Sequence, residues 1–177
     1  MTPFSLHGIG VSNGIAIGKA HLISNALLEV VQYDIDIKNI PHEIKRFEDA
    51  IAAVRIELNK IKSQLPSDSP GELGAFIDTH IMILNDKSLS VLPKSIIENE
   101  KCNAEWAIKK QMDSVVNQFE QIEDQYLRER KQDVIQVVER VIKILLGHSN
   151  QIAVKNKEKL TILVAHDISP ADALHFK

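Results

Sequence analysis

The sequence predicts an α+β fold in which a helical domain is inserted into a small, incomplete α/β unit. Three observations indicate this: glycine-rich stretches with β-like runs fill residues 4–33, residues 41–146 contain few glycines and repeat apolar side chains at helical spacing, and a short apolar run returns at residues 160–165. The β-like ends are too short for separate domains. We therefore expect them to form one unit, whose sheet is incomplete.

Short β-like runs predict the strands of the α/β unit. Residues 15–17, 20–23 and 30–33 are mostly apolar, and glycines at positions 8, 10, 14 and 18 separate or precede them. Such runs between turn-forming residues are typical of strands. The run at 160–165 predicts one more strand, followed by a helix that starts at Ser169 with Pro170 in its first position.

Apolar spacing predicts the helices of the inserted domain. The clearest case is a heptad seam from Ile44 to Leu65, about six turns long, which Pro66 brings to an end. Further helices are expected at residues 73–84, at about 90–100, and along seams at 108–122 and 127–145, with Gly147 as the last cap. Short links favour antiparallel neighbours, so the domain is expected to consist of antiparallel hairpins arranged like a four-helix bundle.

Composition narrows the possible functions. The chain has 177 residues and a formal net charge of −3, whereas a duplex-binding protein needs a basic face, so nucleic acid is not expected as a partner. No apolar stretch approaches the roughly 20 residues of a membrane-spanning helix, and the first six residues lack the features of a signal peptide. Cys102 is the only cysteine, which excludes an intrachain disulfide and suits a reducing, cytoplasmic location.

Candidate catalytic groups are few. The loop at residues 8–14 matches neither G-x-G-x-x-G nor a P-loop, so tight turns between strands are the favoured interpretation. None of the seven histidines lies three or four positions from another, which argues against a metal site. His80 is interpreted as a hydrogen-bonded packing residue on an apolar helix face, and His166 stays a catalytic candidate because it ends a strand. Cys102 is interpreted as an ordinary thiol in a polar link, and the carboxylates between residues 113 and 129 as solvated helix surface.

An apolar group near an acid stands out from these ordinary patterns. It combines residues beside the seam of the second helix with aromatic residues of neighbouring helices: Met82, Ile83, Asp86, Leu89, Phe76 and Phe119. Apolar side chains left over at a helix end and rimmed by acids predict a partner-binding surface. Ordinary core packing is the alternative.

Five stretches, taken in order, resemble enzyme I of the bacterial phosphotransferase system. They are GIGVSNGIAIGKA at residues 8–20, the start of the long heptad helix at 43–47, IDTHIMILND at 77–86, DQYLRERKQDV at 124–134 and ILVAHDISP at 162–170. Their order and spacing cover nearly the whole chain. The third and fourth together are specific to that family.

The resemblance implies a phosphohistidine swivelling domain, formed by residues 1–36 and 148–177, and an HPr-binding helical domain at residues 37–147. In that family, phosphoenolpyruvate with magnesium phosphorylates a histidine on Nε2, and the phosphoryl group then passes to a histidine of the carrier protein HPr for sugar uptake. The phosphorylated histidine lies in a Gly-Gly-x-x-Ser-His motif that this chain does not contain, and His175 lacks that context.

The chain is thus expected to be an amino-terminal part with no catalytic residue, metal ligand or cofactor of its own. The parent is expected to use magnesium and to form homodimers through a carboxy-terminal domain. The resemblance does transfer the HPr-docking face, whose positions are Glu72, Ala75, Phe76, Thr79, Met82, Ile83, Asp86, Leu89, Met112, Phe119 and Arg130. Lys87 and Ser88 stand where family members often have acids.

Other functions stay open at this point. The heptad hairpins would also suit a structural or regulatory module that self-associates, and a complete small enzyme would act through His80 or His166. Pyruvate phosphate dikinase and phosphoenolpyruvate synthase share the swivelling domain but lack the helical insertion, so residues 41–146 argue against them. A nitrogen-regulatory paralogue of enzyme I remains an alternative.

Overall fold

The computed structural model describes residues 5, 7–23, 30–67, 69–147 and 161–165. The chain divides into two compact units. The first consists of residues 1–25 and 154–167, and the second of residues 26–153 and 168–177. The first unit is therefore assembled from stretches that lie on either side of the helical part of the sequence.

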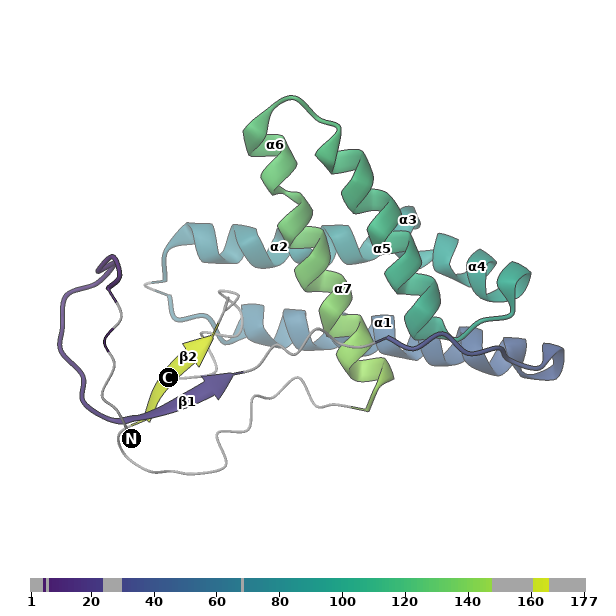
Figure 1. Cartoon of the computed structure of the whole chain (residues 1–177), viewed down its shortest axis with the longest axis horizontal. Helices are drawn as coiled ribbons and strands as arrows, with labels where there is room; N and C mark the ends of the chain where they lie inside the picture. The colour runs from purple at the N-terminus through teal and green to yellow at the C-terminus, as the bar shows by residue number, and fades with distance from the viewer. Residues whose placement is uncertain (1–4, 6, 24–29, 68, 148–160, 166–177) are drawn as a thin grey trace. The chain divides into compact units, whose positions relative to one another are not determined.

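The first unit contains two parallel strands, β1 (Lys19–Ile23) and β2 (Thr161–Ala165) (Figure 1). Lys19 pairs with Thr161, and the register continues to Ile23 and Ala165. The strands predicted at 20–23 and 160–165 are confirmed. The strand predicted at 15–17 is wrong, because these residues are loop and the side chains of Ile15 and Ile17 are exposed. An apolar alternation forms a strand only where a neighbour takes up its backbone hydrogen bonds. The helix start predicted at Ser169 lies outside the described residues.

The second unit is helical, as the periodicity predicts. After a short 3-10 turn, η1 (Ile37–Asn39), it contains α1 (Ile40–Ser63), α2 (Gly71–Asn85), α3 (Lys87–Ser90), α4 (Leu92–Glu100), α5 (Ala104–Glu120), α6 (Gln125–Glu129) and α7 (Lys131–Leu145). The single seam expected at 127–145 is in fact two helices, α6 and α7, which meet at Arg130. The short α3 was not predicted, because one helical turn is too short to show an apolar period.

Local sequence explains several helix ends. Asp86 and Asp124 act as N-caps: the carboxylate of Asp86 accepts from the Ser88 amide at 2.8 Å, and that of Asp124 from the Leu127 amide at 2.9 Å. Gly147 follows α7 with a φ of 73°, in the left-handed region that glycine enters without strain. The cap predicted there is confirmed.

The core of the second unit lies between α1, α2, α5 and α7 (Figure 1). The heptad seam of α1 faces inward, and Phe47, Val54 and Leu58 are completely buried. They pack in one cluster with side chains of α7 such as Val137 and Val141. Burying a side chain of this size stabilises the fold by about 1.5–3 kcal/mol, so these rows account for much of the stability of the unit.

A buried ion cluster joins α1 to α5 and to the end of α7. The guanidinium of Arg46 lies 2.6 Å from the Glu43 carboxylate and 2.7 Å from that of Glu105, and it also donates to the Leu145 carbonyl at 3.0 Å. Burial alone would raise the pKa of Glu105. Hydrogen bonds from Arg46, from the backbone and from Asn103 outweigh burial, so the pKa lies below its ordinary value.

Asn103 extends this cluster to the segment that precedes α1. Its amide nitrogen donates to Glu105 at 3.0 Å and to the Val31 carbonyl at 3.1 Å, and its amide oxygen accepts from the Tyr33 backbone at 3.1 Å. The strand predicted at 30–33 is therefore wrong: this segment binds the α4–α5 link, with only a single β-bridge from Asp34 to Cys102. Cys102 is completely buried in that link, although the sequence predicts a polar setting.

Candidate partner-binding surface

Helix α2 carries most of the predicted surface on one face. Residues three or four apart in a helix lie above one another, so Glu72, Phe76, Thr79, Ile83 and Asp86 form a continuous row, with Ala75 and Met82 beside it. The opposite face of α2 buries Ile77, His80 and Leu84 in the core. The core contacts of α2 therefore fix which face is left for a partner.

Exposure separates the predicted residues of α2 and α3 into three groups. Glu72, Ala75, Met82 and Asp86 are exposed, whereas Phe76, Thr79 and Ile83 are half-buried. Met82 stands out because a large apolar side chain is 67% exposed there. Leu89 is only 2% exposed and belongs to the core. Its place on the predicted surface is wrong, since α3 turns this side chain inward.

Asp86 supplies the negative charge at the end of the row. Its side chain accepts hydrogen bonds from the Ser88 hydroxyl and the Ser88 amide, which lower its pKa below the ordinary value. The carboxylate is therefore ionised at neutral pH and held in one orientation. Lys87 follows it directly and is exposed, so the charge at this corner is mixed.

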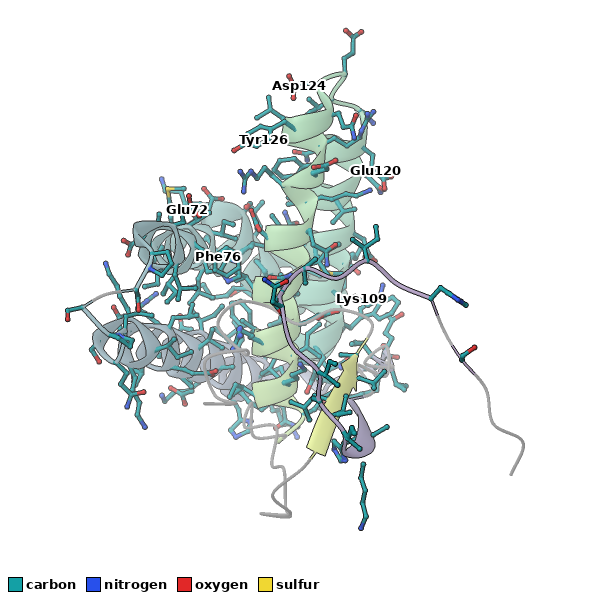
Figure 2. All side chains as sticks on the ribbon, turned by 90° about the vertical axis from the view of Figure 1, so that its left-hand side faces the viewer. Glu72, Phe76, Lys109, Glu120, Asp124 and Tyr126 are labelled. Atoms are coloured by element: carbon teal, nitrogen blue, oxygen red, sulfur yellow. The ribbon has the colours of Figure 1, made fainter. Side chains whose placement is uncertain are left out.

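The remaining predicted residues belong to α5 and to the junction of α6 and α7. Met112 and Phe119, two helical turns apart on α5, are half-buried. Arg130 is exposed at the junction. Glu72 and Phe76 can be followed on α2 in Figure 2, and Tyr126 on α6 near the turn between α5 and α6. All eleven predicted positions lie in the helical unit, and all but Leu89 keep some exposed surface.

Tyr126 holds Arg130 in place, a contact that the sequence analysis missed. The Arg130 guanidinium donates to the Tyr126 hydroxyl, lies 4.5 Å above the Tyr126 ring centre, and pairs with Asp133 at 3.3 Å. The hydrogen bond with Tyr126, followed by that with Asp133, raises the pKa of Arg130. The spacing of four residues between Tyr126 and Arg130 on one helical stretch was the signal available in the sequence.

His80 is a packing residue and not an accessible nucleophile. It is completely buried, its ring centre lies 4.1 Å from that of Phe76, and its Nε2 lies 4.0 Å from an Asp133 oxygen. The contact with Phe76 links the buried face of α2 to its outer row. His166 and His175 lie outside the described residues, and the loop at 8–14 is exposed.

Two kinds of feature are absent from the part of the chain that the structure describes, a metal-ligand cluster and a membrane-spanning helix. Within residues 5, 7–23, 30–67, 69–147 and 161–165, no three His, Cys, Asp or Glu side chains gather closely enough to hold a metal ion. In the same ranges, no helix combines the length and the apolar character needed to cross a membrane. The acidic side chains Asp113, Glu120, Glu123, Asp124 and Glu129 are exposed, as predicted.

The chain is similar in sequence to known phosphoenolpyruvate-protein phosphotransferases. The phosphoenolpyruvate-protein phosphotransferase of Cupriavidus necator is 47% identical over 99% of this chain, and that of Listeria monocytogenes is 33% identical over 94%. This chain covers 31% and 29% of those two proteins, so it spans about three tenths of their length.

Solved structures agree with the fold. A solution structure of an Enzyme I protein covers 93% of this chain with a TM-score of 0.74 and 28% identity, and the match covers 66% of that protein. The N-terminal domain of Enzyme 1 - Nitrogen matches with a TM-score of 0.69, and the match covers 92% of this chain and 65% of the chain of that structure. Because the identity is 22%, this match shows likeness of fold alone. The family model described as PEP-utilising enzyme, N-terminal, matches residues 7–130. The resemblance seen in the sequence is confirmed, and this chain belongs to the N-terminal family of PEP-utilising enzymes.

Proposed function

We propose that this chain is the HPr-docking part of a phosphoenolpyruvate-protein phosphotransferase. The observation that carries the proposal is the row along α2, whose outer face presents apolar side chains between Glu72 and Asp86 while its inner face is fixed in the core. The relatives are named for phosphoryl transfer from phosphoenolpyruvate to a protein. Because the Gly-Gly-x-x-Ser-His motif is absent from this chain, its contribution is recognition of the carrier rather than chemistry.

The docking surface is assigned to ten residues. They are Glu72, Ala75, Phe76, Thr79, Met82, Ile83 and Asp86 on or directly after α2, Met112 and Phe119 on α5, and Arg130 between α6 and α7. Protein interfaces concentrate their affinity in a few apolar anchors surrounded by a polar rim. Met82 is the anchor in this proposal because it is the most exposed of the large apolar side chains on α2.

The wider architecture follows from the same family. We propose that the first compact unit, residues 1–25 and 154–167, belongs to a phosphohistidine swivelling domain, which the antiparallel hairpins of the second unit interrupt. The parent would act in the cytoplasm in sugar uptake and dimerise through a carboxy-terminal domain. Magnesium would serve the parent with phosphoenolpyruvate, but the described residues of this chain offer no cluster of three ligands for it. No step in this chain is therefore assigned to the metal.

Titration of the chain with HPr tests the docking proposal. Met82→Asp places a charge at the centre of the surface, and we expect it to weaken HPr binding at least about tenfold, the loss typical of an anchor residue. Ile56→Asp is the matched control, since Ile56 is 69% exposed on α1 and outside the proposed surface. Calorimetry measures both affinities. An unchanged affinity of the Met82→Asp variant, or no HPr binding by the unsubstituted chain, contradicts the proposal.

Two further measurements separate the alternatives. A self-associating helical module would sediment as a dimer or larger species without HPr. If the chain is a docking module, we expect it to sediment as a monomer at every protein concentration. A complete small enzyme would acquire acid-labile phosphate from phosphoenolpyruvate. We expect the chain alone to acquire none.

A further inference from the structure

A groove on the helical unit lies outside the proposed docking surface. It runs between α1 and the α3–α4 turn, has a volume of about 300 Å³, and is lined by Phe47, Glu48, Ile51, Ala52, Arg55, Ser90, Val91 and Lys94. None of these residues is among the ten assigned to HPr. The size matches the lower end of pockets that take small molecules. The groove is therefore a site separate from the proposed HPr surface.

Four of the eight residues that line the groove are apolar. Phe47 and Ile51 belong to the buried seam of α1 and form part of the rigid core, whereas Ala52 is exposed and Val91 is 44% exposed. The space is therefore shaped by residues that the fold itself fixes. Binding is favourable when an apolar group displaces water from an apolar surface of this kind.

The polar residues give the groove a net positive charge. Lys94 lies 2.8 Å from the Glu48 carboxylate, so these two charges neutralise each other. The guanidinium of Arg55 makes no hydrogen bond or ion pair with any described residue, although it lines the groove. A planar, always charged guanidinium prefers a carboxylate, which it binds through two parallel hydrogen bonds. The Ser90 hydroxyl already donates to the Asp86 carbonyl at 2.8 Å.

We propose that this groove binds a small monocarboxylate with an apolar tail, its carboxylate on Arg55 and its tail against Ile51, Ala52 and Val91. A volume of 300 Å³ holds about ten non-hydrogen atoms if each takes about the 30 Å³ share of a water molecule. A straight-chain acid of eight carbons has that size. For so small and open a site we expect a Kd on the order of millimolar. The proposal is independent of the assigned HPr surface.

Titration with sodium octanoate tests the proposal, followed by the backbone amide signals of the whole chain. We expect shifts at residues 47–55 and 90–94. Octylammonium has the same tail with the opposite charge, and acetate has the charge without the tail, so both are expected to bind at least about fivefold more weakly. Equal binding of octylammonium, or shifts spread evenly over the surface, overturns the proposal.

Two substitutions locate the site. Ala52→Trp fills the groove from an exposed helix position and is expected to weaken octanoate binding at least about tenfold. Arg55→Gln removes the cation and is expected to weaken it about three- to tenfold. Lys60→Gln is the matched control, because Lys60 is an exposed cation of the same helix that does not line the groove. If Ala52→Trp alters the fold, Arg55→Gln against Lys60→Gln decides alone, and equal affinities for these two variants refute the assignment.

Discussion

Replacing Arg46 with methionine tests whether the buried ion cluster holds the helical unit together. Methionine keeps much of the length of the side chain but removes its charge and its donors. The change leaves the carboxylates of Glu43 and Glu105, whose side chains are 8% and 5% exposed, without their common cation. The Leu145 carbonyl at the end of α7 loses the same donor.

The structure gives the size of the effect. Removing one partner of a buried ion pair typically costs about 3–5 kcal/mol, because an uncompensated charge stays buried. The Arg46 side chain is 29% exposed, so water reaches part of the site and the lower end applies. We expect a loss of about 3 kcal/mol at pH 7. For a domain of this size, that loss lowers Tm by about 10 °C.

The stability lost in the Arg46→Met variant should depend on pH, which the loss of packing alone would not cause. In the unsubstituted chain, the pKa of Glu105 lies below its ordinary value of 4.5, so its contribution to stability is present above that value and is lost as pH falls through the folded-state pKa. In the Arg46→Met variant the bonds from Arg46 are gone, and burial raises the pKa of the Glu105 carboxylate. Protonation then relieves the buried charge. The difference in stability between the two chains should therefore shrink from pH 7 to pH 5.

Urea unfolding followed by far-ultraviolet circular dichroism measures both effects. Lys45→Met is the control, since Lys45 pairs with Asp49 at 2.8 Å on the open face of α1 and its removal should leave the denaturation midpoint unchanged. A loss below about 1 kcal/mol for Arg46→Met, or a difference that stays constant from pH 7 to pH 5, refutes the reasoning.

Three further predictions concern packing, the single thiol and a helix end. Leu89→Ala should lower the free energy of unfolding by about 2–5 kcal/mol, because it opens a cavity in the core. Cys102 is completely buried, and burial, followed by the charge of Glu100, raises its thiol pKa, so iodoacetamide should modify the folded chain far more slowly than the urea-unfolded chain. Gly147→Ala should cost about 1 kcal/mol, because a φ of 73° strains any residue with a Cβ while nothing within 4 Å crowds the added atom.

Controls and contrary outcomes are available for all three. Leu92→Ala removes a leucine that is 47% exposed and should cost less than about 1 kcal/mol, so equal losses for Leu89 and Leu92 would contradict the burial of Leu89. Modification of Cys102 at equal rates in the folded and unfolded chains would contradict its burial. Gly147→Asn should be tolerated better than Gly147→Ala, since asparagine enters the left-handed region more easily. The reverse order would contradict the strain argument.

Much of the helical unit could be predicted because its signal is local. The seam of α1 repeats at the spacing of one helix face, and Phe47, Val54 and Leu58 are buried as that spacing requires. The outer row of α2 follows from the same rule, since residues three and four apart share a face whatever the rest of the chain does. Prediction was less successful at residues 15–17 and 30–33, because a strand depends on a neighbour that local pattern does not reveal.

By itself, the sequence determined the positions of most helices, the α2 row with Met82 on it, and the family of the chain. Only the tertiary structure decided which groups from distant positions meet. Arg46 binds Glu105 and the Leu145 carbonyl across 59 and 99 positions, and Leu89 turns into the core although the sequence suggested a surface. The physical reason is the range of the two kinds of information. Helical periodicity is visible within a few consecutive turns of one chain segment, whereas burial and ion pairing depend on which helices pack together.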